Sequence, residues 1–438
     1  MTSYQLPPLD AILDEPIRLP QRGLPYFRGT VPCTIRQLRA ERLNVLKGDV
    51  ALPALVLKAD ALNNNLRVMA EYSERHGFVL APHGKTTMSP QLFQRQLAAG
   101  AWGMTVANAV QADVAIRAGA RHVIVANEVV AEADIVALAM QAKGGAGCEV
   151  MTLVDSAYSV ERLDGAARRG LVREPIMVLL ELGTAHGRAG CRTVEEAIGV
   201  ARLVMESEHL TLAGVECYEG VIGNTRDEAV LARVSQFLKW TRAVVEALDF
   251  EGAFGGVARV IVSAGGSRYF DLVSRILCQQ PWALSSEHPV SVVVRAGCYL
   301  THDHGAYARS SPLSQPEPPD ECLEPALEIW ASVLSTPEAG RVIVGMGRRD
   351  VAYDSGLPLP LAVQSSVATG PESLPPGDCV VEKLDDQHAY VTCGRGRLQV
   401  GDLVGFGLSH PCTVFDKWRL IPVVDSEYVV VDYVRTLF

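Results

Sequence analysis

The sequence lacks several features that would assign it to whole classes of protein. No run of 18 apolar residues occurs, which argues against a membrane-spanning helix. Basic residues form no stripe and the net charge is -10, so we do not expect nucleic acid as a partner. The first residues, MTSYQLPPLDAILDEP, contain no apolar signal core, and the ten cysteines include no C-x-x-C pair. We therefore expect a cytoplasmic protein with reduced thiols and no contact with a membrane.

What is present is the composition of an ordinary folded protein. Hydrophobic residues make up 48% and charged residues 21% of the 438 residues, enough for one or two domains with a sizeable core. From about residue 50 to 305, apolar runs rich in β-branched residues alternate with Ala-rich segments of helical spacing. Because these apolar runs are continuous rather than alternating, they are typical of strands buried on both faces of a parallel sheet.

The apolar runs number one more than a closed barrel requires, since a (β/α)8 TIM barrel has eight strands. The nine runs are residues 54–58, 78–81, 103–108, 122–127, 149–154, 176–182, 212–218, 259–264 and 291–296. We place ALVLK (54–58) outside the barrel, because the helix after it can open the barrel domain. The sequence thus predicts an α/β protein with a barrel domain over residues 50–305.

The pattern of apolar and polar residues changes after residue 305. A Pro-rich connection, SSPLSQPEPPDECLEP (310–325), is followed by short alternating runs that Gly, Pro and Asp separate. Alternation of this kind is typical of antiparallel strands with one solvated face. We therefore predict a second, mainly antiparallel β domain made of residues 306–438 together with residues 1–49.

Polar and glycine-rich segments follow the predicted barrel strands, where TIM barrels carry their functional residues. They contain His83 and Lys85, Glu181 with His186 and Arg188, Tyr218 in ECYEG, SAGGS (263–267), and RAGCYLTHDH (295–304). Glycine loops after the seventh and eighth strands form the usual phosphate site of such barrels, and glycine lets the backbone approach an anion. Two ordinary tight turns are the alternative interpretation of these loops.

Lys85 is the first candidate for chemistry. A lysine that faces a closed pocket is costly unless it is paired or chemically used, and a desolvated lysine attacks carbonyl groups. Its natural partner in a phosphate-binding barrel is pyridoxal phosphate. A surface lysine at the start of a loop is the alternative, and the residues alone do not separate the two.

The segment PHGKTTMSP (82–90) resembles the Schiff-base segment of the fold-type III pyridoxal-phosphate enzymes, which have alanine racemase-like barrels. Within them it is similar to the D-threonine aldolase / D-serine dehydratase family. ELGTAHGRAG, GVECYEG, VSAGGS, RAGCY and SHPCTVFDKW occur in the family's order, and the resemblance covers roughly residues 50–430. In that family the lysine lies on the first barrel strand, which agrees with placing ALVLK before the barrel.

The resemblance implies roles for individual residues. Lys85 would hold pyridoxal 5′-phosphate and move the α-proton, and His83 is a second candidate catalytic residue. Arg188 would face the pyridine nitrogen and keep the ring neutral, because a guanidinium cannot accept a proton. A surface ion pair is the alternative for Arg188, and a core position for Tyr218. The residues expected around the cofactor are Lys85, Arg188, Tyr218, Ser263, Gly265, Gly266, Gly297 and Tyr299.

A candidate metal pair lies near the C-terminus, where His410 and Cys412 flank a proline. A His-x-Cys pair can place two ligands on one side of an extended segment. In the resembled family the metal binds here, and dehydratase-like members carry His-x-Cys where aldolase-like members carry His-x-Asp. Thiolate and imidazole favour zinc over magnesium or calcium, with manganese as an alternative. His302 and His304 form a lower-ranked rival pair.

The resemblance, closer to the D-serine dehydratase-like members, implies a lyase. We expect it to eliminate water from a β-hydroxy D-amino acid, giving a 2-keto acid and ammonia. Retro-aldol cleavage to glycine and an aldehyde, racemisation, and a non-catalytic pyridoxal-phosphate carrier are the alternatives. His186 stands where the family commonly has Gln, and Thr-Thr-Met follows the lysine, so a substrate bulkier than D-serine is plausible. The family also implies a homodimer.

Overall fold

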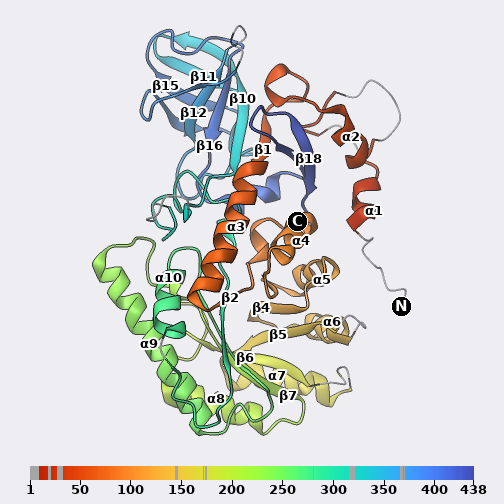
Figure 1. The fold of residues 1–438 in the computed structure, drawn as a ribbon, viewed down its shortest axis with the longest axis vertical. Helices are drawn as coiled ribbons and strands as arrows, with labels where there is room; N and C mark the ends of the chain where they lie inside the picture. The colour runs from red at the N-terminus through yellow and green to blue at the C-terminus, as the bar shows by residue number, and fades with distance from the viewer. Residues whose placement is uncertain are drawn as a thin grey trace.

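Two sheets organise the chain, as the computed structural model in Figure 1 shows. The structure describes residues 9–17, 21–26, 33–143, 147–170, 172, 175–279, 281–314, 321–365, 368 and 370–438. An eight-stranded parallel barrel occupies the lower half of the view and a ten-stranded, mainly antiparallel sheet the upper half. The long helix α3 (Ala59–His76) runs from the upper sheet down to the barrel.

Parallel pairing joins the barrel strands in the order expected of a (β/α)8 barrel. The strands are β2 (Val79–Leu80), β3 (Met104–Val106), β4 (His122–Glu128), β5 (Glu149–Val154), β6 (Ile176–Leu182), β7 (Leu210–Cys217), β8 (Val260–Ala264) and β9 (Val290–Val294). β9 pairs with β2, and a bridge between His83 and Thr105 links the end of β2 to β3, so the barrel is nearly closed. The predicted barrel and each of its eight strands are therefore confirmed.

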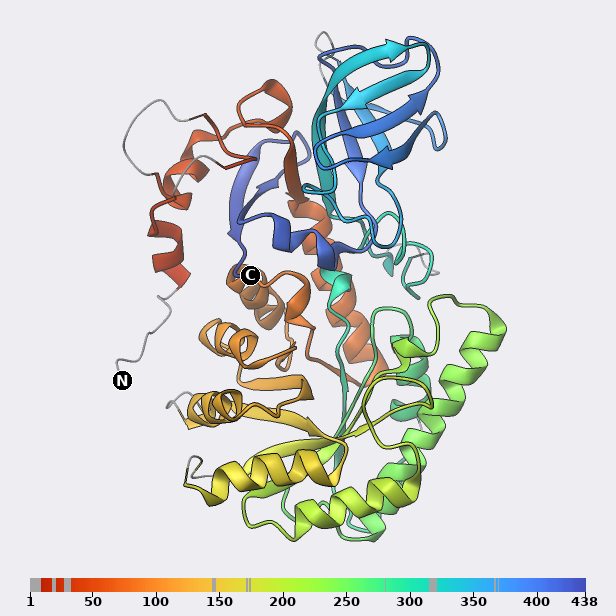
Figure 2. The same ribbon diagram turned by 180° about the vertical axis from the view of Figure 1, so that it is seen from behind.

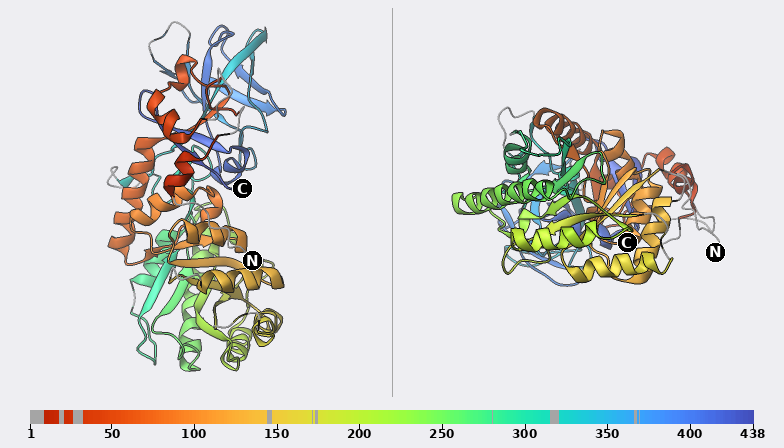
Figure 3. Two further views of the ribbon diagram at one scale, coloured as in Figure 1. Left: turned by 90° about the vertical axis from the view of Figure 1, so that its right-hand side faces the viewer. Right: turned by 90° about the horizontal axis from the view of Figure 1, so that it is seen from below.

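Helices cover the outside of the barrel, as the view from below in Figure 3 shows. They are α4 (Pro90–Ala98), α5 (Ala109–Arg117), α6 (Glu132–Lys143), α7 (Ala157–Arg168), α8 (Val194–Met205), α9 (Glu228–Phe250) and α10 (Phe270–Val273). Polar caps start several of them where a strand's loop ends: the Asn108, Thr193 and Asp227 side chains each accept a hydrogen bond from a backbone N–H of the first turn. The loops before these helices form the mouth of the barrel.

The run 54–58 lies outside the barrel, as the sequence predicted, and it belongs to the second sheet, which the sequence did not predict. β1 (Ala54–Lys58) pairs antiparallel with β10 (Leu327–Glu338) and parallel with β17 (Leu420–Val424). The remaining strands are β11 (Arg341–Val344), β12 (Leu359–Gln364), β13 (Glu372–Ser373), β14 (Cys379–Leu384), β15 (Ala389–Cys393), β16 (Leu403–Gly407) and β18 (Val430–Arg435). Part of the Pro-rich connection, residues 315–320, lies outside the described residues.

The N-terminal segment packs against this sheet (Figure 2). Helices α1 (Leu9–Asp14) and α2 (Ile35–Glu41) belong to the N-terminal segment, and the buried side chains Ile17, Leu24, Ile35, Leu38 and Val45 share a core cluster with Trp330 and Tyr433 of the sheet. The predicted domain boundaries stay a prediction.

None of the helices among the described residues is long and apolar enough to span a membrane.

The C-terminal strand also holds the loop that follows Lys85. The backbone N–H of Leu437 donates to the carbonyl of Met88 (2.8 Å), and that of Arg435 donates to the Gln91 side chain (2.9 Å). These contacts fasten the end of the second sheet to the start of α4, directly after the segment that carries Lys85. The two sheets therefore meet at the mouth of the barrel.

Candidate active site

A cavity of about 560 Å³ opens at the barrel mouth, between the loops after the barrel strands and a segment of the second sheet. Many of the residues singled out from the sequence line it: His83, Lys85, Arg188, Tyr218, Gly265, Gly266, Gly297, His410 and Cys412. The fold thus brings the lysine, the glycine loops and the candidate metal pair into one space. Ser263 and Tyr299 do not line this cavity.

Lys85 lies in a short 3-10 helix, η2 (Gly84–Thr86), that follows β2. The turn is tight, because a Cβ added at Gly84 would lie 2.6 Å from the Phe93 ring of α4. The lysine side chain is exposed to the cavity, so it is not desolvated as the sequence argument assumed. It is instead accessible to a carbonyl compound that enters the cavity.

His83 precedes this helix, and its Nδ1 atom is buried without a hydrogen-bond partner. Burial, helped by the positive charge of Lys85, holds the pKa of His83 well below its usual range. The ring is therefore neutral at neutral pH. A ring whose pKa is held this low resists taking up a proton at neutral pH, so a catalytic role for His83 stays a prediction.

Arg188 and Tyr218 approach each other across the mouth. The guanidinium carbon of Arg188 lies 5.0 Å from the centroid of the Tyr218 ring, a cation–π contact, and the Arg188 side chain is otherwise exposed. Burial raises the pKa of Tyr218, so its hydroxyl stays protonated. That Arg188 faces the pyridine nitrogen stays a prediction.

The two glycine loops are built by close backbone packing. Gly265 has a φ of +92°, which favours glycine, and a Cβ added at Gly266 would lie 2.9 Å from the Tyr218 ring. A Cβ at Gly297 would lie 2.5 Å from the carbonyl oxygen of His83, so the loops after β9 and β2 touch. These glycines are therefore required by the packing of the loops against neighbouring protein atoms.

Glu219, which the sequence reasoning missed, uses part of the expected phosphate cradle. Its fully buried carboxylate accepts hydrogen bonds from the backbone N–H groups of Gly265 (3.0 Å) and Gly266 (2.7 Å). An anion in the cavity would therefore meet the next part of the loop, at Ser267 and Arg268, which also line the cavity. With Lys85 in the same space, these residues fit an aldehyde cofactor that carries a phosphate.

Ser263 and Tyr299 do not line the cavity, but their hydroxyl groups accept hydrogen bonds from neighbouring residues. The Ser263 hydroxyl accepts a hydrogen bond from Arg295 (2.7 Å), and the Tyr299 hydroxyl accepts one from Gln96 of α4 (3.3 Å). Arg295 also forms a buried ion pair with Glu216, and both of these residues line the cavity. Each of them sits at the end of a barrel strand, which is the signal that could have found them.

Acidic side chains gather around Glu216 at the wall of the cavity. Burial, the charge of Glu216 and a hydrogen bond with Glu128 raise the pKa of Glu181 to about 9. Glu181 is therefore protonated at neutral pH. Burial also raises the pKa of Glu216, against the opposing charge of Arg295.

The candidate metal segment is fixed by two aspartates. The His410 backbone, which has a φ of 65°, donates its N–H to Asp303 (2.9 Å), and Asp303 also accepts from the backbone of Tyr307 (2.9 Å). The Nδ1 atom of His410 contacts the Asp354 carboxylate. Metal-binding histidines almost always make such a contact through their second nitrogen, and it leaves Nε2 for a metal.

Cys412 lies beside groups that were not predicted. Its Sγ atom is 3.3 Å from the Thr86 hydroxyl and 3.4 Å from the Sγ of Cys298, and both residues line the cavity. In the part of the chain that the structure describes, no three His, Cys, Asp or Glu side chains are already arranged around a common metal position. The pair fits a metal that keeps positions open for other ligands.

The rival pair, His302 and His304, does not line the cavity. Both residues are largely buried, and burial lowers the pKa of each. The His302 Nε2 lies 3.3 Å from the Ser314 hydroxyl, and the His304 ring packs against Gly407, where an added Cβ would lie 2.4 Å from it. These contacts explain the two histidines as packed interior residues.

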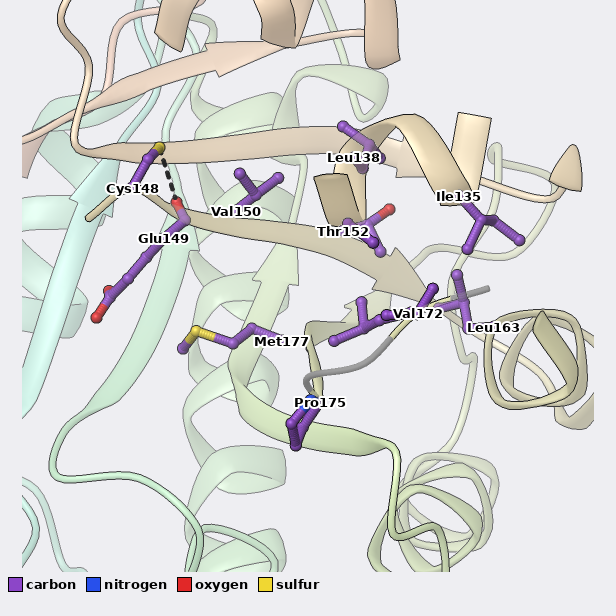
Figure 4. A pocket seen from close by; sticks show the side chains of 12 residues that line it. Ile135, Leu138, Cys148, Glu149, Val150, Thr152, Leu163, Val172, Pro175 and Met177 are labelled. Atoms are coloured by element: carbon purple, nitrogen blue, oxygen red, sulfur yellow. Dashed lines mark hydrogen bonds between the residues drawn. The ribbon is translucent and has the colours of Figure 1, made fainter. Parts of the chain in front are cut away.

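A second cavity, of about 170 Å³, lies on the outer side of the barrel (Figure 4). It is enclosed by α6, α7, β5 and β6, and its lining is mostly apolar, with Ile135, Leu138 and Leu163 among the side chains drawn. No residue is shared between this lining and the mouth cavity. Of these two cavities, only the one at the mouth is lined by site residues that were predicted from the sequence.

Known proteins share this architecture. Two family models match, the alanine racemase N-terminal domain over residues 57–264 and a putative serine dehydratase domain over residues 326–424. The chain is 28% identical to a 3-hydroxy-D-aspartate aldolase from Paracoccus denitrificans, over 84% of this chain and 88% of that relative. Among solved structures, D-threonine aldolase from Filomicrobium marinum superposes with a TM-score of 0.73 at 24% identity, covering 90% of this chain and 97% of that one.

A dehydratase has the same fold. The D-threo-3-hydroxyaspartate dehydratase from Delftia sp. HT23 superposes with a TM-score of 0.70 at 18% identity, covering 90% of this chain and 99% of that one. A dehydratase of that name has also been solved as a histidine-to-alanine variant, and as a metal-free variant in which a cysteine two positions further on is replaced by alanine. With both family models matching in sequence order, the chain belongs to the fold-type III pyridoxal-phosphate family, with an alanine racemase-like barrel followed by a serine dehydratase-like domain.

Proposed function

We propose that the chain is a lyase dependent on pyridoxal phosphate and a metal, which eliminates water from a β-hydroxy D-amino acid. The products are a 2-keto acid and ammonia. The observation that carries the proposal is the shared cavity: Lys85 from the barrel and the His410–Cys412 pair from the second sheet line the same space. A cofactor lysine and a metal pair that face one substrate are what metal-assisted elimination requires.

The residues around Lys85 handle the proton and the charge. Pyridoxal phosphate, when bound, supplies an electron sink at the substrate's α-carbon. The Lys85 amine, exposed to the cavity, accepts the α-proton, while burial and the charge of Lys85 keep the neighbouring His83 ring neutral. Arg188 and Arg268 line the same cavity, and we assign Arg188 to the pyridine nitrogen and Arg268 to the phosphate of the cofactor.

The His410–Cys412 pair holds the metal in this proposal. Nε2 of His410 and Sγ of Cys412 are the donor atoms, and Asp354 holds the His410 ring from its other side. A metal there acts as a Lewis acid that makes hydroxide a tolerable leaving group. Zinc suits a thiolate and an imidazole best, with manganese as the alternative.

The dehydratase assignment draws support from the spacing of the two ligands. In the dehydratase described above, a histidine and a cysteine two positions apart were replaced, and the cysteine variant was solved in a metal-free form. His410 and Cys412 have the same spacing in this chain. The substrate class we infer is a β-hydroxy D-amino acid such as 3-hydroxy-D-aspartate, D-threonine or D-serine.

Retro-aldol cleavage is the second candidate. A relative that aligns with 84% of this chain is a 3-hydroxy-D-aspartate aldolase, so the same cavity also suits cleavage of the Cα–Cβ bond. Such cleavage would remove the proton from the β-hydroxyl rather than from the α-carbon and would release glycine. A racemase would instead need an acid–base residue on each face of the cofactor.

Product analysis with D-threonine separates these reactions. Elimination gives 2-oxobutanoate and ammonia in equal amounts, whereas retro-aldol cleavage gives glycine and acetaldehyde. Racemisation gives a threonine isomer and neither set of products. We expect 2-oxobutanoate and ammonia, and 3-hydroxy-D-aspartate should correspondingly give oxaloacetate and ammonia. Glycine with an aldehyde from both substrates would replace the dehydratase with the aldolase.

We also infer a homodimer in the cytoplasm, as the family resemblance and the reduced cysteines suggest. Light scattering coupled to size-exclusion chromatography measures the oligomeric state directly. A mass of twice the 47.2 kDa chain is expected, and a monomer that turns over substrate would contradict the dimer.

A further inference from the structure

The metal motif contains two candidate ligands, His410 and Cys412, and the fold places a third candidate, the thiol of Cys298, beside them. Cys298 begins η5 (Cys298–Leu300) directly after β9 of the barrel, whereas Cys412 belongs to η7 (Pro411–Thr413) of the second sheet. Their Sγ atoms lie 3.4 Å apart at the wall of the cavity that contains Lys85. Two thiols from separate sheets therefore meet in the proposed active site.

The separation of the two sulfurs is too long for a disulfide and is compatible with two ligands of one ion. A disulfide holds its sulfurs about 2.05 Å apart. Two thiolates bound at about 2.3 Å to a tetrahedral zinc lie roughly 3.8 Å apart. The observed 3.4 Å is close to the second arrangement. Two thiols in simple contact can lie at the same distance. The choice between a contact and a shared metal therefore depends on how many ligands the metal needs.

Catalytic zinc sites bind three protein ligands and keep the fourth position for water or substrate. His410 and Cys412 supply two. Glu216, another possible ligand at this cavity, is already paired with Arg295. We propose that Cys298 is the third protein ligand, so that the metal is held by two thiolates and one imidazole. This inference rests on the proposed His410–Cys412 site and completes it.

The surroundings of the two sulfurs suit bound thiolates. The Thr86 hydroxyl lies 3.3 Å from the Sγ of Cys412 and 3.7 Å from that of Cys298, so it can donate a hydrogen bond to either. Donors of this kind orient metal ligands and stabilise their charge. Because Thr86 follows Lys85 in the chain, the metal would adjoin the cofactor lysine.

Metal binding requires one movement. The described residues contain no group of three such side chains already arranged around one point, and the His410 ring is held at Nδ1 by Asp354. The three side chains must therefore draw together around the metal when it enters, while Asp354 keeps its contact with Nδ1 of His410. The set of two thiolates also selects zinc more strongly than a single thiolate does, which disfavours manganese.

Cobalt(II) in place of zinc tests the ligand count without relying on turnover. Each thiolate bound to cobalt contributes to a charge-transfer band in the near ultraviolet. The variants are Cys298→Ser and Cys412→Ser, with Cys278→Ser in the π-helix after α10 as the matched control. Cofactor absorbance checks that each variant is folded. We expect the band to fall by about half in each of the first two variants and to stay unchanged in the control.

Zinc competition with a coloured chelator gives a second readout. Loss of a group that only supports a ligand lowers metal affinity about 10–100-fold, so loss of Cys298 as a ligand should lower it by more than about 100-fold. An unchanged band and affinity in Cys298→Ser, with loss in Cys412→Ser, would overturn the third ligand and leave the proposed pair intact. No effect in Cys412→Ser, or no metal bound by the wild type, would overturn both. A Cys298–Cys412 disulfide in the purified, active enzyme would overturn the third ligand as well.

Discussion

Individual residues in the barrel carry charge states that the sequence does not reveal. Glu181 is protonated in the folded protein because it is buried near Glu216 and Glu128, and its pKa rises from 4.5 to about 9. Between these two values the unfolded chain has lost a proton that the folded protein keeps. Folding stability therefore falls as the pH rises through this window.

Glu181→Gln should remove that pH dependence. We expect the melting temperature of the variant, relative to that of the wild type, to increase as the pH rises from about 5 to about 8.5. The reason is that glutamine stays neutral throughout this range. Thermal unfolding of both proteins with the cofactor bound measures the difference. Glu161→Gln, at an exposed position on α7, serves as the control and should show none. A difference that is the same at every pH would contradict the protonated Glu181.

Asp354 is predicted to act through His410. Asp354→Asn removes the charge that contacts Nδ1 of His410 and should lower zinc affinity by about 10–100-fold. Cofactor absorbance should not change, since Asp354 does not line the cavity. Chelator competition measures the zinc affinity, and Asp386→Asn, in an exposed ion pair with Arg349, is the control. Equal zinc affinity in both variants would remove Asp354 from the site.

The predictable residues of the site are those that follow a strand in the sequence. Lys85, Tyr218 and the glycine loops were found in this way, because the ends of parallel strands meet at one mouth. Contacts between distant segments were missed. Nothing in ECYEG indicates that Glu219 binds the next loop's backbone, and nothing in RAGCY indicates that Cys298 meets Cys412. Such contacts depend on how the two sheets pack together.

At the scale of elements, glycine positions in the barrel test the strand pairing. A Cβ at Gly214 in β7 would lie 1.8 Å from the carbonyl oxygen of Ile261 in β8, whereas nothing lies within 4 Å of one at Gly199 in α8. Gly214→Ala should therefore lower stability by about 1–3 kcal/mol. Gly199→Ala should raise it by about 0.5–1 kcal/mol. Urea unfolding measures both, and similar effects of the two would contradict the described pairing.

The barrel strands were predicted because each is a continuous apolar run between helical segments. The second sheet was predicted less completely. Two of its strands, β12 (Leu359–Gln364) and β13 (Glu372–Ser373), were not predicted. The sequence of β12 is preceded and interrupted by prolines in LPLPLAVQ, and a proline argues against a strand because it cannot donate a hydrogen bond to the neighbouring strand. Pro360 sits at a register irregularity between β12 and β16, which accommodates it.

At the scale of the whole molecule, a bound metal would join the two sheets. Its proposed ligands His410 and Cys412 belong to the second sheet's segment, and Cys298 follows a barrel strand. Removing the metal with EDTA should abolish turnover while the cofactor absorbance remains. Zinc at about 100 times its dissociation constant should stabilise the fold by about 2.7 kcal/mol. Calorimetry with and without zinc checks this, and equal melting temperatures with full activity would contradict a metal site.

The attachment of the cofactor to Lys85 underlies the site, the proposed reaction and the position of the metal. Borohydride reduction of the coloured enzyme, followed by digestion and mass mapping, tests it most directly. We predict a pyridoxyl group on the peptide that contains PHGKTTMSP, at Lys85 and at no other lysine. A label on a different lysine, or no label on a protein supplied with pyridoxal phosphate, would contradict it.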